Sequence, residues 1–309
     1  MHFIDQGVRR PAVLCRSLAV VGAALLLGAA APPVTPPQFA HWIDGTAASE
    51  PEMQVQAIDA DTFVIRQSVK TNFEAPFLYL LFGHDRALLL DTGAGGLKVR
   101  PTIDQLIAAW RVKHGGRAIH LVVAHTHGHG DHHAGDDEFA DRADTDVIGL
   151  KPEQVAAFFH IADWPREEAR FDLGGRVLDI IPTPGHEPAH IMVYDARTRL
   201  LFSGDMLYPG RLYVPVDQFG VFQASADRLA VFAKTHPIRA LLGAHIEMTT
   251  TPGQDYPMRA PTHPAEHPLP LSPAVIGELQ KAVDQAGPNP TIDRHADFIV
   301  YPRPARPIG

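Results

Sequence analysis

The chain has 309 residues, of which 45% are hydrophobic and 20% are charged, as in a globular protein with a large buried core. Its formal net charge is −8 and it has no basic stripe, which argues against nucleic acid as its main partner. The single cysteine, Cys15, lies near the N-terminus, so the rest of the chain has no disulfide and no thiolate. Any metal site in the rest of the chain must therefore use histidine and carboxylate groups.

The N-terminal residues 1–31 are typical of a signal peptide. Arg9, Arg10 and Arg16 form a basic region, and an apolar run over residues 17–31 ends in small residues that suit a cleavage site. We therefore expect export to the periplasm or beyond, with an uncleaved membrane anchor as the alternative. Residues 32–55 begin Pro-rich and are expected to be a linker, and residues 56–309 are expected to be a single domain.

The sequence of the first half of that domain predicts five strands and two helices. We expect a strand over 62–68, a hairpin of strands 77–82 and 87–91, a helix from about Thr102 to the glycines at 115–116, a buried strand over 118–125, a strand over 146–150 and a helix over 151–162. The hairpin turns at the sequence GHDR, which connects two apolar runs.

The second half again combines strands and helices. We expect a strand and turn over 176–185, a second hairpin over 190–205, a helix over 225–237 capped by Ser225, a buried strand over 238–245, a loop over 262–272, a helix over 273–287 and a last strand over 296–302. Because strands and helices are intermixed and the hairpins need antiparallel neighbours, the pattern favours a layered α/β domain with mixed sheets.

Histidine and aspartate residues stand at the ends of five apolar runs. Strand ends are where a rigid sheet can present side chains to one site. These segments are LLLDTG with Asp91, the run VVAHTHGHGDHH, IIPTPGH with His186, LLFSGD with Asp205 and LLGAH with His245. One such segment would mean little, whereas five of them indicate a metal site.

The histidine-rich run has the pattern H-x-H-x-D-H, which suits two metal ions better than one. His127 and His129 are two residues apart and can serve the first ion, while Asp131 and His132 can serve a second. We expect His186 to complete the first set, His245 to complete the second, and Asp205 to bridge them. His125 and His133 flank the four ligands and are expected not to bind metal.

This combination of segments resembles the metallo-β-lactamase superfamily, over the region from about Asp91 to His245. The resemblance implies a four-layer αββα sandwich with mixed sheets and metals at one edge. It implies the same two ligand sets, with Asp205 on both metals. It also implies that Asp91 and His190 lie beside the site without binding metal. The expected cofactor is a pair of Zn²⁺ ions, with iron or manganese as alternatives in one or both sites.

Asp205 directs the resemblance to the glyoxalase II and lactonase branch, because class B β-lactamases lack a carboxylate at this position. Only about 60 residues follow His245, with one clear helix, so no glutathione-binding helical domain is evident. The oligomeric state is open. The expected activity is hydrolysis of an ester, thioester or lactone carbonyl, by attack of a hydroxide that bridges the two metals. Hydrolysis of β-lactams, hydrolysis of phosphate or sulfate esters, and non-catalytic metal binding in the envelope are the alternatives.

The stretch after Asp205 is expected to border a small-molecule substrate. Tyr208 or Tyr213 can donate a hydrogen bond to a developing oxyanion, or both can pack as loop aromatics. Arg211 either contacts an anionic substrate or faces solvent. Asp131 is the expected catalytic residue, since beyond holding metal it can orient the attacking hydroxide or take its proton.

Overall fold

The computed structural model of the chain describes residues 1–3, 7 and 35–304. The predicted signal peptide, with Cys15, therefore falls almost entirely outside the described residues. Within the described residues, no helix is both long and apolar enough to cross a membrane.

The first of two large sheets has six strands in the spatial order β1-β2-β3-β4-β5-β6. They are β1 (Met53–Asp59), β2 (Thr62–Gln67), β3 (Phe77–Phe82), β4 (Arg86–Leu90), β5 (His120–Ala124) and β6 (Thr145–Val147). Neighbours from β1 to β4 are antiparallel, which confirms the predicted hairpin of β3 and β4, whereas β4, β5 and β6 run parallel.

The second large sheet has the spatial order β13-β12-β10-β9-β8-β7. Its strands are β7 (Ala169–Asp172), β8 (Val177–Pro182), β9 (Ile191–Asp195), β10 (Leu200–Gly204), β12 (Ala240–Gly243) and β13 (Pro270–Leu271). The predicted second hairpin is confirmed as β9 and β10, and β10 pairs in parallel with β12. Both large sheets are therefore mixed.

Within residues 35–304, a small third sheet and five α-helices complete the fold. The sheet has the order β11-β15-β14, with β11 (Arg211–Pro215), β14 (Asp293–Arg294) and β15 (Ile299–Arg303). The α-helices are α1 (Arg100–Lys113), α2 (Gly130–His133), α3 (Pro152–Phe159), α4 (Phe219–Thr235) and α5 (Ala274–Gln285), and two 3₁₀ turns are η1 (Asp136–Glu138) and η2 (Val216–Gln218).

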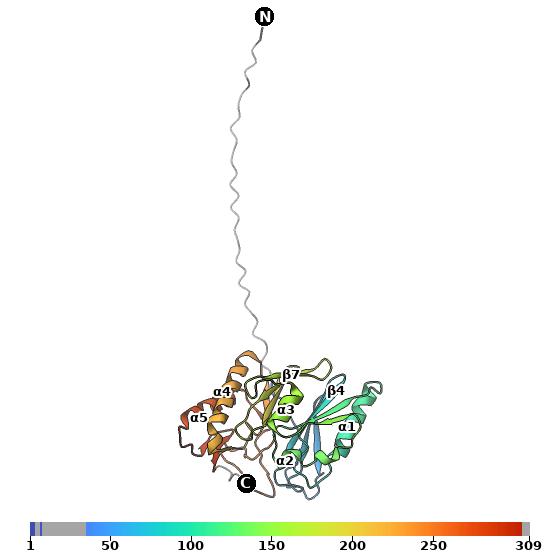
Figure 1. Ribbon diagram of the computed structural model, residues 1–309, viewed down its shortest axis with the longest axis vertical. Helices are drawn as coiled ribbons and strands as arrows, with labels where there is room; N and C mark the ends of the chain where they lie inside the picture. The colour runs from blue at the N-terminus through green and yellow to red at the C-terminus, as the bar shows by residue number, and fades with distance from the viewer. Residues whose placement is uncertain (4–6, 8–34, 305–309) are drawn as a thin grey trace. The chain divides into compact units, whose positions relative to one another are not determined.

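Alternation along the strands divides the apolar residues among three layers of core. Leu88 and Leu90 face the core between the two large sheets, whereas Ala87 and Leu89 face the core beneath α1. On the second sheet, alternate residues pack beneath α4 and α5. Figure 1 shows α1 beyond the sheet that contains β4, and α4 with α5 beyond the opposite sheet. The order of layers is thus helix, sheet, sheet, helix, which confirms the expected αββα sandwich.

Helix α4 begins earlier than the sequence suggested. It starts at Phe219, so Ser225 lies inside the helix and the prediction that Ser225 caps it is wrong. The Ser225 hydroxyl instead donates a hydrogen bond to the carbonyl of Pro184 at 2.7 Å. This bond ties α4 to the loop that presents His186, two residues further along.

Part of the segment expected to be a linker contributes to the core. Trp42 is 7% exposed and packs edge-on against the ring of Phe77, with centroids 5.0 Å apart. Strand β1 also begins inside this segment, at Met53. The apolar side chains of Trp42 and Ile43 explain this packing, since burying them stabilises the fold in a way that a solvated Pro-rich spacer cannot.

Candidate metal centre

All seven predicted ligands converge from the ends of four core strands. The histidine-rich run follows β5 and continues into α2, His186 lies beyond the end of β8, Asp205 follows β10, and His245 lies two residues beyond β12. Within each sheet the strands β4 with β5, and β10 with β12, run parallel, so their carboxyl ends meet at the same edge. The two sheets therefore deliver the ligands from opposite sides of one site.

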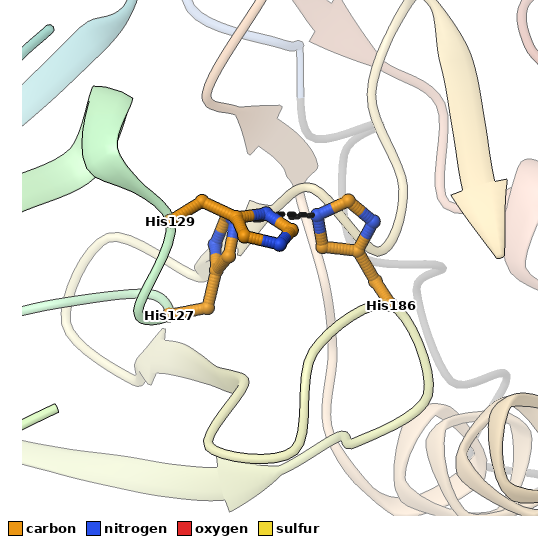
Figure 2. A group of neighbouring side chains, drawn as sticks. All are labelled: His127, His129 and His186. Atoms are coloured by element: carbon orange, nitrogen blue, oxygen red, sulfur yellow. Dashed lines mark hydrogen bonds between the residues drawn. The ribbon is translucent and has the colours of Figure 1, made fainter. Parts of the chain in front are cut away.

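Group one consists of His127, His129 and His186, whose rings point toward one another in Figure 2. The Nε2 of His127 lies 2.8 Å from Nδ1 of His129 and 3.2 Å from Nε2 of His186, and the last two atoms are 3.0 Å apart. His186 donates its Nδ1–H to the carbonyl of Tyr213 at 2.6 Å, which leaves a lone pair on Nε2. Three nitrogens that face one point in this way suit a metal ion.

Group two consists of Asp131, His132 and His245. The Nε2 atoms of the two histidines are 3.3 Å apart, and each lies 3.4 Å from Oδ2 of Asp131. His245 donates its Nδ1–H to the carbonyl of Glu74 at 2.8 Å, so Nε2 is the nitrogen that can bind a metal once it has lost its proton. Two imidazoles and a carboxylate oxygen thus surround a second point.

Asp205 lies between the two groups, with one oxygen toward each. Its Oδ2 is 4.0 Å from Nε2 of His127 and 3.6 Å from Nε2 of His186. Its Oδ1 is 3.6 Å from Nε2 of His132 and 3.5 Å from Nε2 of His245. This Oδ1 is buried and accepts no hydrogen bond from any described residue. A buried carboxylate oxygen without a donor is costly, and a cation on each side would satisfy it.

Asp91 binds the nitrogen of His132 that faces away from group two. Its carboxylate is fully buried and accepts hydrogen bonds from the Thr126 amide at 2.7 Å and from Nδ1 of His132 at 2.9 Å. A carboxylate on the far nitrogen fixes the tautomer of a metal-binding histidine and raises its basicity. Asp91 lies where a supporting residue is expected, and its oxygens are absent from both groups.

His190 holds the main chain of Asp205. The Asp205 amide donates to Nε2 of His190 at 3.2 Å, so this nitrogen carries no proton. The proton therefore sits on Nδ1, which donates to the hydroxyl of Thr183 at 2.8 Å. His190 thus uses both nitrogens within the protein, which is the arrangement of a supporting residue.

The two groups differ in their electrostatics. Burial and the neighbouring imidazoles hold the pKa of His127 well below its usual value, and burial also lowers the pKa of His186. Burial would lower the pKa of His245 as well, but Asp205 and Asp131 outweigh it and raise that pKa to about 10. The pKa of His132 is likewise raised, against its burial, by Asp91, Asp205 and Asp131.

The outer histidines of the run make a separate pair. Nε2 of His125 contacts Oδ1 of Asp136 at 2.8 Å, and the ring of His133 lies edge-on to that of His125 with centroids 6.3 Å apart. Neither residue belongs to a group of candidate ligands among the described residues. The geometry agrees with their expected role as flanking residues.

A cavity of about 780 Å³ opens onto the two groups and includes Tyr208 and Tyr213 in its lining. The Tyr208 hydroxyl is buried and contacts the Arg211 carbonyl at 2.6 Å and Oε2 of Glu247 at 3.0 Å, so its proton is already engaged. Burial and Glu247 raise the pKa of the Tyr213 hydroxyl to about 12. Arg211 is 5% exposed, so the expectation that it faces solvent is wrong.

Three supporting contacts of the site were not anticipated from the sequence. Glu74 and Tyr213 offer their main-chain carbonyls to His245 and His186, and Thr126 donates to Asp91. The position of Thr126 between two histidines is the one signal that pointed to it. Because every residue has a main-chain carbonyl, the roles of Glu74 and Tyr213 could not be predicted from their residue types.

Curated proteins with known activities share parts of this chain. A hydroxyacylglutathione hydrolase of Rhizobium meliloti is 31% identical over 133 residues, which are 42% of this chain and 49% of that protein. An acyl-coenzyme A thioesterase of Gallus gallus is 25% identical over 203 residues, covering 55% of this chain and 72% of that protein. The match thus spans about half the length of the Rhizobium protein.

A solved structure and a family profile also match this chain. The crystal structure of the DIM-1 metallo-β-lactamase matches with a TM-score of 0.50 at 14% identity, over 77% of this chain and 99% of that one. This likeness concerns the fold alone. Residues 72–230 match the family profile described as the metallo-beta-lactamase superfamily. With two candidate metal groups at the edge of an αββα sandwich, the chain belongs to the metallo-β-lactamase superfamily.

Proposed function

We propose that this protein is an exported hydrolase with two zinc ions that cleaves an ester, thioester or lactone carbonyl. The observation that carries the proposal is the position of Asp205, with one carboxylate oxygen toward each group of ligands. The relatives named above are hydrolases of an acylglutathione and of an acyl-coenzyme A, which supports an acyl substrate. Residues 1–31 support export.

The residues of the two groups fit zinc, because imidazole nitrogens and carboxylate oxygens are its usual ligands in catalytic sites. When bound, two zinc ions would lower the pKa of water to about 7 and polarise a carbonyl oxygen. The chain itself orients the ligands: Tyr213, Glu74 and Asp91 each accept the Nδ1–H of a histidine. The site can therefore keep its geometry while a substrate enters and leaves.

Asp131 is the residue we propose to act on the attacking water. Its side chain is 23% exposed, more than that of any other residue in group two, and it lines the cavity. A partly exposed carboxylate in the lining of the cavity can orient a water molecule and accept its proton. Asp205 is 6% exposed and less suited to that role.

The test is metal analysis of the mature protein, together with rates on a panel of carboxyl esters, thioesters and lactones. We expect two metal ions per chain and turnover of at least one substrate class. Asp131→Ala should lose the metal of group two and at least about 100-fold in kcat/KM, since even outer partners of ligands are worth 10–100-fold. His133→Ala is the matched control and should keep both metals and the rate.

Other outcomes would replace the proposal. If Asp131→Ala kept its full metal content and rate, the two-metal assignment would be wrong. Preferential turnover of nitrocefin, or of a nitrophenyl phosphate, would move the activity to β-lactams or phosphate esters. Two metals per chain without hydrolysis of any panel member would indicate a non-catalytic metal-binding protein. A purified protein that still begins at residue 1 after expression in a Gram-negative host would contradict cleavage and favour the uncleaved anchor.

A further inference from the structure

Three arginines line the cavity, and one of them is already neutralised. Arg211 is buried, and its guanidinium lies 3.1 Å from Oδ2 of Asp255 and 3.5 Å from Oε1 of Glu247. It also donates to the carbonyl of Tyr256. With two carboxylates and a carbonyl around it, Arg211 has little capacity left for a substrate.

The other two arginines of the cavity, Arg259 and Arg303, are exposed. Neither has a carboxylate of the described residues within ion-pair distance. Each guanidinium lies on an aromatic ring instead: Arg303 is 3.7 Å from the ring centroid of Tyr213, and Arg259 is 4.7 Å from that of Phe73. Stacking engages the face of a guanidinium and leaves N–H groups at its edge for an anion.

Both aromatic platforms connect directly to the metal groups. The carbonyl of Tyr213 holds His186 of group one, and Phe73 precedes Glu74, whose carbonyl holds His245 of group two. The two arginines therefore stack on rings that belong to, or directly precede, the residues supporting two different groups. Arg259 has a φ of +61°, a conformation that is uncommon for a non-glycine residue and is found preferentially at ligand sites.

The carboxylates of the cavity do not cancel these two charges. Glu247 contacts Arg211, and Asp131 and Asp205 face the histidines. Glu74 forms no ion pair with Arg259 or Arg303 among the described residues. We propose that Arg259 and Arg303 bind an anionic group of the substrate, a carboxylate or a phosphate, away from the scissile carbonyl. This inference rests on the proposed hydrolase function and adds a substrate class to it.

The test compares thioesters that share one acyl group and differ in the thiol. The neutral thiol is 2-mercaptoethanol, and the anionic thiols are 3-mercaptopropionate and 2-mercaptoethyl phosphate. A second pair, the butyryl and succinyl thioesters of 2-mercaptoethanol, tests an anion on the acyl side. We expect wild-type kcat/KM to favour an anionic member by about tenfold, the worth of a charged hydrogen bond. The thioester with the highest kcat/KM shows whether the site prefers a carboxylate or a phosphate.

Substitution of the arginines should remove this preference. In Arg259→Gln and Arg303→Gln the ratio of anionic to neutral kcat/KM should fall by at least about threefold each, and about tenfold in the double variant. The ratio is insensitive to partial misfolding, which lowers both rates alike. Arg86→Gln is the matched control, because Arg86 is exposed on the ring of Phe171 but lies outside the cavity. Equal ratios in wild type and all variants would overturn the proposal.

A binding measurement separates this proposal from the proposed activity. Benzenesulfonate, a weak metal ligand, and its neutral analogue methyl phenyl sulfone are titrated into the metal-loaded protein. We expect the sulfonate to bind more tightly, and the double variant Arg259→Gln/Arg303→Gln to weaken it by about tenfold. If no ester, thioester or lactone is hydrolysed but this difference persists, the proposed activity is wrong and the anion site stands. If the double variant binds the sulfonate as wild type does, the anion site is wrong.

Discussion

The two groups of ligands at the centre share Asp205 but differ in charge. Group one is three imidazoles, and the pKa values of His127 and His186 are lowered, so its histidines are ready to bind metal near neutral pH. Group two contains the carboxylate of Asp131, and its histidines have raised pKa values. Metal binding at group two must therefore displace protons, while at group one it need not.

This difference means that one chain presents two unlike candidate metal sites that share Asp205. An all-imidazole group carries no formal charge, whereas a group with Asp131 beside Asp205 offsets part of the charge of an ion. Group two is also tied to the fully buried Asp91 through His132. We expect group two to respond more strongly than group one to pH and to changes in its outer partners. Five predictions test this contrast.

The largest effect is expected from Asp205→Asn, which removes charge from both groups at once. Both metals should bind more weakly and kcat/KM should fall by at least about 100-fold, because outer partners of ligands alone are worth 10–100-fold. Metal content after dialysis and the rate on the best substrate measure this. A loss of metal from only one group would show that Asp205 does not bridge them.

The next prediction separates the groups. His186→Ala should empty group one and His245→Ala should empty group two, so each variant should retain about one metal ion per chain. Metal analysis with a spectroscopic probe such as Co²⁺ should give two different single-site spectra, since the ligands differ. Identical spectra from the two variants would contradict the division into two groups. Circular dichroism checks that both variants remain folded.

A smaller and one-sided effect is expected from Asp91→Asn. Asp91 has a φ of +69°, which asparagine tolerates, so the backbone can stay in place. The amide presents one acceptor where the carboxylate presented two, and His132 loses its charged partner. Metal affinity should fall about 10–100-fold at group two and remain unchanged at group one. Competitive chelator titration resolves the two affinities, and an equal loss at both would refute the contrast.

Metal-free protein should show opposite pH dependence for the two groups. The raised pKa of His245 stabilises the fold fully below pH 6.5, and this contribution is lost as pH rises toward about 10. The lowered pKa of His127 has the reverse effect. Below pH 6.5 the His127 imidazole is protonated in the unfolded chain but stays neutral in the folded protein, so stability falls as the pH drops.

Urea unfolding of EDTA-treated protein between pH 5 and 10 measures both contributions. His245→Gln should flatten the alkaline side of the profile, and His127→Gln should flatten the acid side. If both substitutions flatten the same side of the profile, the two groups do not differ in the way proposed.

The smallest effect is expected from Thr183→Val, which removes the acceptor for Nδ1 of His190. The free energy of unfolding should fall by about 1 kcal/mol, the usual worth of a hydrogen bond. Because His190 holds the shared Asp205, the metal affinities of both groups should shift alike. Chemical denaturation and chelator titration measure the two quantities. A shift confined to one group would show that His190 acts on that group alone.

The frame of the site was predictable because its elements have strong periodic signals. Apolar runs that end in Asp91, His186, Asp205 and His245 identified the strand ends, and parallel pairing then dictates that their side chains share an edge. The two hairpins followed from apolar runs on either side of short polar turns. These signals depend on local sequence, so the layers and the convergence of the seven residues could be inferred.

The rest depends on contacts that residue types do not encode. In the part of the chain that the structure describes, strand β11 pairs only with the distant β15, so its sequence looked like a loop. Helix α4 begins at Phe219 after a Gln218 that makes no side-chain cap, and Ser225 offered a stronger but misleading start signal. The pairing of Arg211 with Asp255 and Glu247 likewise appears only once the chain is folded.

Glu74 and Tyr213 illustrate how this architecture can change its substrate. In each residue the main-chain oxygen orients a histidine, while the side chain lines the cavity. Substitution alters the side chain and leaves the carbonyl in place. Evolution can therefore vary the cavity wall at these positions without disturbing the metal ligands, so that the chemistry of bond cleavage and the choice of substrate are inherited as separable traits.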